Sequence, residues 1–374
     1  MQVGLGLNFM APTPLFTLIM DEYGVTKAMV SLTVSAVLMV LTISLLPSGI
    51  LIAKIGATRA MGFAGLLMSA GLLHPFVDSY SVVLILRLVL GTGIALSIPA
   101  TSAIIMEWFK PSELPIMNGV NEAGRALGLS LGVLGAVPIA NNFGWQTTLC
   151  VYSVVPLIAT ILWLIFGRKP WNGLEMESPP PLRDNIRYIF NTNNLWLALG
   201  VMGPFSVFIG YSAWLPTYYN ESRGMTMEMA GSIVAAMPLA AGLINPVSGF
   251  IQSRLGRRKP LLITAGLIIP VCAVGAILST NSVMILISVM VLGVWSSMFI
   301  VAMLTIPMEL PGATASRAGM STAAVLTIGN LVAVISPIFI GSITDIAGSY
   351  LPALSILAVM PLTLFIPGIL LPET

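Results

Sequence analysis

The sequence predicts an all-α membrane protein with twelve transmembrane helices, arranged as two pseudo-symmetric bundles of six. Of 374 residues, 57% are hydrophobic and only 8% are charged, whereas about 25% of the residues of a typical soluble domain are charged. The apolar residues form runs long enough for bilayer-spanning helices, which need about 20 residues each. A repeat of glycines at a single offset then predicts the two bundles. The lipid bilayer is therefore the expected surrounding of this chain.

Twelve apolar stretches, separated by turn residues and charges, are the predicted spans. They cover residues 1–20, 29–53, 59–76, 81–106, 117–140, 146–167, 194–218, 229–252, 260–279, 282–307, 318–341 and 350–371. The connection 168–193 contains three consecutive prolines and several charges, which is typical of a solvated linker. We therefore expect one six-helix bundle at 1–167 and a second at 194–374.

The N-terminal segment shows no pattern of a cleaved signal peptide, so the first apolar stretch is expected to be retained. Residue 1 lies almost inside this stretch. Either the natural N-terminus lies upstream, or the first helix is short.

Basic residues predict the orientation, because Lys and Arg collect in short cytoplasmic loops. If the spans alternate, one side holds Lys54, Arg59, Lys110, Arg168, Lys169, Arg183, Arg187, Arg254, Arg257, Arg258, Lys259 and Arg317. Only Lys27 and Arg223 lie in loops on the other side. We expect a multi-pass protein of the inner (plasma) membrane with both termini and the linker in the cytoplasm.

The internal repeat appears when the chain is shifted by 200 residues. The matched pairs are Gly24 with Gly224, Thr26 with Thr226, Gly49 with Gly249, Gly56 with Gly256, and Gly119 with Gly319. A chance alignment among 35 glycines is the alternative, but one offset across several loops favours duplication. Parallel repeats of this kind occur in one large class of transporters.

The inventory of reactive residues argues against other classes of protein. The chain has one histidine and two cysteines far apart, without the spacing of a metal site or of a nucleophile and its base. We expect no enzyme activity, no metal and no cofactor. A net charge of +2 argues against a nucleic-acid partner. Neither a channel filter nor an ATP-binding loop is visible, so a gradient-driven transporter acting as a monomer is expected.

Two loops share a pattern of glycines and basic residues. They read GILIAKIGATR from Gly49 to Arg59 and GFIQSRLGRRK from Gly249 to Lys259. In the fourth span, Arg87 begins the sequence RLVLGTG. These features resemble the signature loop and the Arg-xxx-Gly-x-Gly motif of the major facilitator superfamily, and with the twelve spans the resemblance covers essentially the whole chain.

Within that family, residues 214–226 and 329–350 are most similar to the cyanate permease and nitrate/nitrite porter branch. The resemblance implies alternating access and a small inorganic or organic anion as substrate. The usual acidic residue of the signature loop is replaced by Ala53 and Ser253, so a weaker charge lock is expected there. A Gly-Pro motif typical of antiporters is absent from the fifth span, which favours symport or uniport.

Gating is assigned to the signature loops and to two acidic residues at span ends. We expect Glu107 and Glu309 to pair with cytoplasmic basic residues of those loops. The predicted gating set is Gly49, Gly56, Arg59, Glu107, Gly249, Arg254, Gly256, Arg257, Arg258 and Glu309.

Charged residues within spans cost several kcal/mol by insertion scales and tend to face a cavity. Arg87 offers a planar fork of donors for an anion, although it could equally brace helices through backbone carbonyls. Glu122 and Arg125 lie one turn apart and either form a structural pair or leave Glu122 as a proton carrier.

The resemblance implies that the first, fourth, seventh and tenth helices line the central path. Candidate lining residues there are Asn8, Thr13, Tyr211, Trp214, Trp295, Ser296 and Ser297, with Asn121 and Asn330 as second choices. An Asn in a span is often only a hydrogen-bonding link between helices, and Trp214 is equally consistent with an interfacial anchor. His74 is expected at the membrane interface rather than in a proton relay.

Two other functions stay open from the sequence. Efflux of a hydrophobic or cationic compound, coupled to protons, fits the apolar and aromatic spans, although Arg87 would repel a cation. A sensor that binds a solute without moving it is the alternative of another class.

Overall fold

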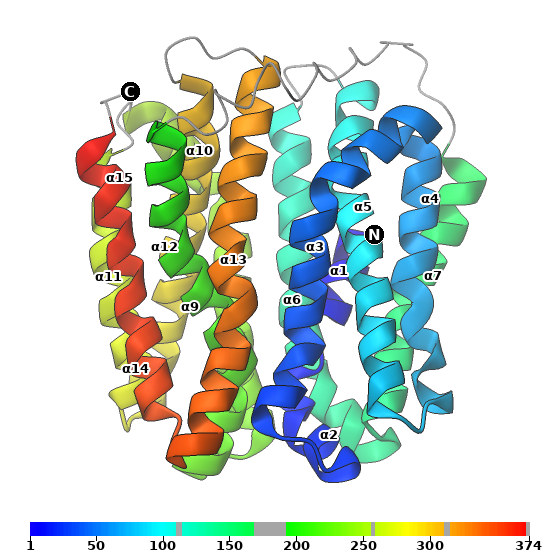
Figure 1. Ribbon diagram of the computed structural model, residues 1–374, viewed down its shortest axis with the longest axis vertical. Coiled ribbons are helices and arrows are strands. Elements are labelled where there is room, and N and C mark those ends of the chain that lie inside the picture. The colour runs from blue at the N-terminus through cyan, green and yellow to red at the C-terminus, as the bar shows by residue number, and fades with distance from the viewer. Residues whose placement is uncertain (110–113, 168–191, 256–258, 310–314, 372–374) are drawn as a thin grey trace. The chain divides into compact units, whose positions relative to one another are not determined.

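The computed structural model describes residues 1–109, 114–167, 192–255, 259–309 and 315–371, which are almost wholly helical (Figure 1). The first six spans are formed by α1 (Gln2–Met10), η1 (Thr13–Leu15), α2 (Phe16–Tyr23), α3 (Lys27–Ile55), α4 (Ala57–Met68), η2 (Ser69–Phe76), α5 (Tyr80–Trp108), α6 (Leu114–Phe143) and α7 (Trp145–Phe166). The last six are formed by α9 (Thr192–Arg223), α10 (Met227–Leu255), α11 (Lys259–Leu278), α12 (Ser282–Glu309), α13 (Ala315–Ala347), α14 (Leu351–Val359), η3 (Met360–Leu364) and α15 (Phe365–Leu370). The η elements are 3-10 helices.

Each of the twelve predicted spans coincides with a helical stretch. Among the described residues, 11 stretches are long and apolar enough to cross a bilayer. The third predicted span, 59–76, is instead built from α4 followed by η2, because its second part tightens into a 3-10 helix that contains Pro75. The prediction of an all-α membrane protein is confirmed.

The repeat is visible at the start of α3 and of α10. Gly24 and Gly224 both adopt positive φ, 63° and 67°, a conformation that glycine adopts without a steric penalty. The hydroxyl of Thr26 then accepts a hydrogen bond from the backbone N–H of Met29 at 3.2 Å, and Thr226 does the same for Met229 at 3.3 Å. Both helices that follow are 29 residues long. Local sequence therefore produces the same helix start twice.

Two compact units result from the packing of these helices. Unit 1 comprises Met1–Glu177 and Ser212–Pro238, and unit 2 comprises Ser178–Tyr211 and Leu239–Thr374. The ends of α9 and α10 nearest their connecting loop thus pack with the first six spans. The predicted linker lies almost entirely outside the described residues, and the domain boundaries drawn from it stay a prediction.

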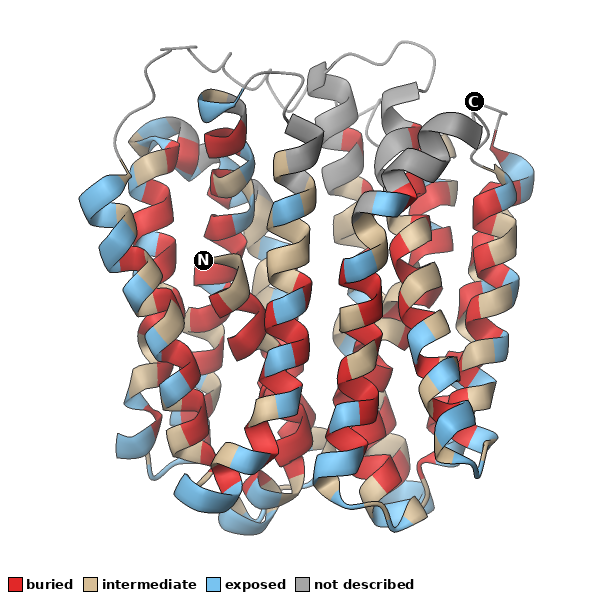
Figure 2. Cartoon of the chain, turned by 180° about the vertical axis from the view of Figure 1, so that it is seen from behind, coloured by how far each residue is buried: buried red, intermediate tan, exposed pale blue. Residues whose placement is uncertain are grey.

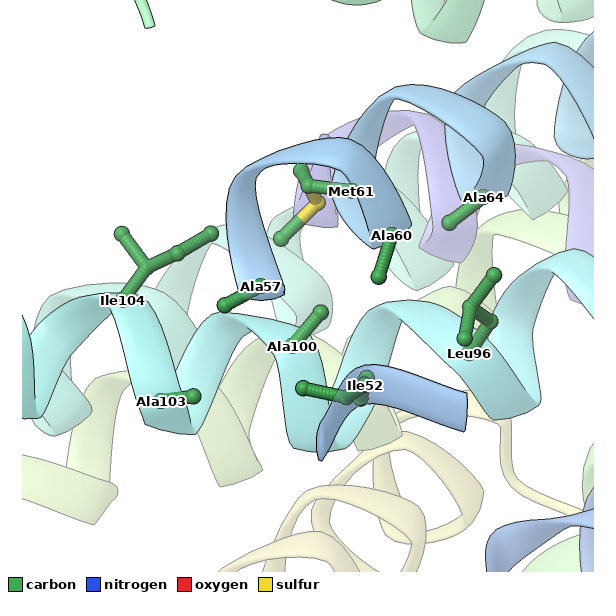
Figure 3. Packing of buried hydrophobic residues seen from close by; sticks show 9 residues of the cluster. All are labelled: Ile52, Ala57, Ala60, Met61, Ala64, Leu96, Ala100, Ala103 and Ile104. Atoms are coloured by element: carbon green, nitrogen blue, oxygen red, sulfur yellow. The ribbon is translucent and has the colours of Figure 1, made fainter. Parts of the chain in front are cut away.

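Small residues allow the close packing of α4 on α5 in unit 1. Figure 3 shows a cluster in which three alanines of α4 face two alanines of α5. A Cβ on Gly93 would lie 2.8 Å from the carbonyl oxygen of Ala64, and one on Gly91 would lie 2.9 Å from that of Val37. The two glycines of the Arg-xxx-Gly-x-Gly motif therefore let α5 approach α4 and α3. Many helices carry a buried stripe beside exposed apolar residues (Figure 2), as expected for helices in contact with lipid.

Candidate functional site

The first span is broken, and the break lies among the predicted lining residues. α1 ends at Met10, and the chain continues through η1 into α2. Pro14 has no N–H, so the carbonyl of Met10 has no α-helical donor. The hydroxyl of Thr13 donates to this carbonyl at 2.9 Å and is fully buried. Thr13 therefore completes the helix break instead of offering its hydroxyl to a cavity.

Arg87 serves the neighbouring carbonyl of the same break. Pro12 leaves the carbonyl of Asn8 without its helical donor, and Nη1 of Arg87 donates to it at 2.7 Å. Arg87 is only 2% exposed, and its Nε has no hydrogen-bond partner among the described residues. Arg87 forms no ion pair with a described residue. Arg87 thus makes the bracing contact that the sequence left open, and it carries a buried charge without a carboxylate partner there.

The side chain of Asn8 is fully used in packing. Its amide nitrogen donates to the carbonyls of Gly4 at 2.9 Å and Tyr152 at 3.0 Å. Its amide oxygen accepts from the hydroxyl of Ser153 at 2.7 Å. Because Pro156 lacks an N–H, Asn8 supplies the donor that the Tyr152 carbonyl would otherwise miss. Asn8 therefore links α1 to α7. This is the alternative role, a hydrogen-bonding link between helices, that the sequence left open for it.

The ring of His74 packs inside the protein, and its predicted depth at the membrane interface stays a prediction. His74 is 3% exposed, and its ring meets that of Trp145 edge-on at 6.4 Å. Nδ1 lies 2.7 Å from the carbonyl oxygen of Gly71, while Nε2 has no partner among the described residues. The 3-10 turn of η2 brings the ring inward, against the start of α7, and this fold-back is not visible in hydropathy.

Glu122 and Arg125 form an ion pair, as one of the two interpretations of the sequence expects, while a role of Glu122 as a proton carrier stays a prediction. Nε of Arg125 donates to the Glu122 carboxylate at 3.0 Å, and Nη2 donates to the same oxygen. The two side chains are 38% and 42% exposed, Arg125 first. The pair is thus partly exposed, whereas Arg87 is buried in this conformation.

Residues of α9 and α10 contribute to unit 1. Trp214 is fully buried and meets Phe16 of α2 edge-on, with ring centroids 5.1 Å apart. This burial excludes the alternative of a lipid-facing anchor for Trp214. Asn141 of α6 donates to the Glu228 carboxylate of α10 at 3.1 Å. The start of α10 is therefore held against the first six spans within unit 1.

The candidates in unit 2 divide into packed and half-buried residues. The hydroxyl of Tyr211 donates to the carbonyl of Leu354 at 3.1 Å and is fully buried, so it serves helix packing. The hydroxyl of Ser297 donates to the carbonyl of Ala241 at 3.0 Å. Ser296 is buried, and its hydroxyl has no partner among the described residues.

Three further candidates, Trp295, Asn330 and, in unit 1, Asn121, are half-buried. They keep polar or aromatic groups accessible, so a role in lining a path stays a prediction.

Of the predicted gating residues, the structure describes the surroundings of those in the N-terminal half of the chain only. Gly56 has φ 85° and ends α3, as expected for a tight turn, while Gly49 and Arg59 are exposed. Glu107 is half-buried and forms no ion pair with the described residues of its signature loop, Lys54 and Arg59, so the expected pairing is not found there. Gly249 and Arg254 lie in α10 and Glu309 ends α12, but the descriptions do not extend to their side chains. Gly256, Arg257 and Arg258 lie outside the described residues.

Sequence reasoning missed the partners of these polar groups. Ser153 on α7 and Thr363 on η3 were not singled out, yet Ser153 holds Asn8, and Thr363 donates to the carbonyl of Gly200 at 2.8 Å. One signal was present, because a proline four residues after a carbonyl removes its helical donor. The spacing of the prolines does not predict which distant side chain donates to each of these carbonyls.

Comparisons with known proteins relate this chain to transporters in sequence and in fold. A probable nitrate transporter of Staphylococcus haemolyticus is 24% identical over 292 residues, which are 74% of this chain and 70% of that protein. A D-galactonate transporter of Escherichia coli is 22% identical over 301 residues, 72% of this chain and 70% of that protein. The crystal structure of a bacterial homolog of the human lysosomal transporter Spinster, inward-facing and unoccupied, superposes with a TM-score of 0.76 at 14% identity, covering 98% of this chain and 91% of that one. Residues 1–337 match the family model of the Major Facilitator Superfamily, and this chain therefore belongs to the major facilitator superfamily and is a multi-pass transport protein, not an enzyme.

Proposed function

We propose that the protein moves a small inorganic or organic anion across the inner (plasma) membrane by alternating access, with proton symport as the coupling. The observation that carries the proposal is the buried charge of Arg87. A guanidinium has five N–H donors, and the described part of the chain gives Arg87 one hydrogen-bond acceptor, a neutral carbonyl, and no carboxylate. A buried cation without a carboxylate partner is costly and favours a mobile anion nearby.

The relatives support the same class of substrate. One is named as a nitrate transporter and another as a D-galactonate transporter, and both solutes are anions. We propose Arg87 as the primary anion contact, with Trp295, Ser296, Asn330 and Asn121 as lining residues. Glu122 is proposed as the proton carrier because it is the acidic residue within the fifth span and its side chain is 42% exposed. Protonation would release it from Arg125, so the ion pair would break when the proton is carried.

The proposal includes an arrangement in the membrane. Two six-helix halves, 1–167 and 194–374, alternate around the substrate, the chain acts as a monomer, and both termini face the cytoplasm. Labelling of single cysteines placed at Gly24 and at Gly49, in a variant without Cys150 and Cys272, tests the orientation. Only the cysteine at position 24 should react with an impermeant maleimide added to intact cells. Labelling at position 49 alone would reverse the assignment.

The decisive experiment is counterflow uptake in proteoliposomes. Nitrate, nitrite, cyanate and galactonate are compared with organic cations such as tetraphenylphosphonium, for the wild type, Arg87→Lys and Arg87→Gln. We expect uptake of at least one anion, weaker uptake in Arg87→Lys, which keeps the charge, and loss of uptake in Arg87→Gln. Saturable uptake of a cation would support efflux of a cationic compound instead. Anion binding without counterflow would indicate a sensor, and anion uptake unaffected in a folded Arg87→Gln protein would refute the site.

A further inference from the structure

The two bonds around Asn8 form one chain of hydrogen bonds across three helices. Arg87 on α5 donates to the carbonyl of Asn8 at 2.7 Å, and the amide of Asn8 on α1 donates to the carbonyl of Tyr152 on α7 at 3.0 Å. Both carbonyls precede a proline by four residues, Pro12 and Pro156. Each therefore lacks its own helical donor, and a side chain from a neighbouring helix replaces it.

The same pairing recurs in unit 2. The carbonyl of Gly200 precedes Pro204 by four residues and accepts from the hydroxyl of Thr363 at 2.8 Å. The carbonyl of Ala333 precedes Pro337 by four residues and accepts from the hydroxyl of Ser336 at 2.9 Å, although here the donor belongs to the same helix. Side-chain donors thus fill the gap left by a proline at several places in this fold, and Arg87 is a charged example.

The surroundings of α1 leave little freedom for this chain of bonds. A Cβ on Gly6 would lie 2.4 Å from the carbonyl oxygen of Arg125, and one on Gly128 would lie 2.2 Å from that of Val3. α1 therefore packs directly on α6, backbone against backbone. A Cβ on Gly4 would also lie 2.9 Å from the ring of Pro156. The Asn8 carbonyl is held at a defined place, facing α5.

We propose that Pro12 keeps the Asn8 carbonyl available as a docking point for Arg87, so that Asn8 is a positioning residue for the guanidinium. Nη1 is held by that carbonyl, which fixes the position of the guanidinium, while Nε has no hydrogen-bond partner among the described residues. The part of the proposal that concerns the aim of Nε rests on the proposed function, because the group it would meet is the transported anion. The part that concerns the hydrogen bond from Arg87 to the Asn8 carbonyl, called the cap below, does not rest on the proposed function.

The cap is tested by rescue. Arg87→Gln removes the donor from a buried carbonyl and is expected to lower the melting temperature in detergent by a few degrees, or to reduce the yield of folded protein. Adding Pro12→Ala provides a backbone N–H at position 12 and should restore most of the loss. The matched control is Pro204→Ala in the same Arg87→Gln background. That proline's carbonyl is served by Thr363, so no rescue is expected. Equal rescue by both prolines, or by neither, would overturn the proposal.

The aim of the guanidinium is tested by transport in Pro12→Ala with Arg87 intact. The new N–H competes for the Asn8 carbonyl and releases Arg87. We expect the half-saturation concentration for the anion to rise several-fold with the maximal rate unchanged, because ground-state and transition-state binding are lost together. A purely structural role would leave the half-saturation concentration unchanged, which would overturn the positioning role. If the wild type transports no anion, the proposed function fails while the thermal rescue still decides the cap.

Discussion

Lys27 and Glu221 form an ion pair in unit 1, with Nζ 2.6 Å from Oε2. Lys27 begins α3, and Glu221 lies in the last turn of α9, so the pair joins two helices that are far apart in the sequence. The side chains are 22% and 33% exposed, Lys27 first. Exposed pairs of this kind contribute about 1 kcal/mol or less. The pair is therefore suited to a contact that forms and breaks during transport.

Charge reversal tests this role of the pair. We expect Lys27→Glu, which brings two carboxylates together, to change the counterflow rate more strongly at low salt than at high salt, because exposed charges are screened. The exchanged double variant, Lys27→Glu with Glu221→Lys, should return the rate towards that of the wild type. A double variant no better than either single variant would show that the pair does not control the rate.

The two threonine caps predict equal effects on stability. Thr26→Ala and Thr226→Ala each remove a hydroxyl that accepts a hydrogen bond from the backbone N–H three residues later. Each change should lower the free energy of unfolding by about 1 kcal/mol. Thr26→Ser and Thr226→Ser keep the acceptor and serve as controls. Thermal melts in detergent compare the four variants. A large effect in one half only would show that the repeat is not equivalent at these caps.

The close approach of α5 to α4 predicts a sharp effect at Gly93. Gly93→Ala places a Cβ 2.8 Å from the Ala64 carbonyl oxygen and 2.9 Å from the Met68 backbone nitrogen, so the backbones must separate. We expect a loss of about 1–3 kcal/mol, the usual cost of overpacking. Gly119→Ala is the matched control, because no atom of the described residues lies within 4 Å of its added Cβ. That change should be neutral or stabilise helix α6 by up to about 1 kcal/mol. Equal melting temperatures of both variants would contradict the packing argument.

The ion pair of Glu122 with Arg125 predicts how uptake responds to pH. If Glu122 carries the coupled proton, Glu122→Gln removes the titrating group and should flatten the dependence of anion uptake on external pH. Counterflow, which needs no net proton movement, should survive. Glu107→Gln removes a carboxylate outside the pair and should leave the pH dependence intact. A pH dependence that persists in Glu122→Gln would place the proton on the substrate or on another group.

The sequence by itself determined where the chain crosses the membrane and that its halves are related. Hydropathy acts over one helix length, and the caps at Thr26 and Thr226 involve neighbours within three residues. Such local features can be predicted without knowing which helices touch. The Gly-x-Gly pattern after Arg87 could likewise be matched to a family motif from the sequence, but the close contact of Gly93 with Ala64 could not.

Tertiary structure decided what the polar residues inside the spans do. Asn8, Thr13 and Tyr211 were candidates to line a path, but each gives its side chain to a backbone carbonyl instead. In a dry interior an unsatisfied carbonyl is costly, so the nearest available donor is drawn to it. Which donor is nearest depends on the packing of α1, α5 and α7, and this packing brings together residues separated by 79 and 144 positions. The sequence supplies the prolines and the donors, and only the folded chain brings each donor to its carbonyl.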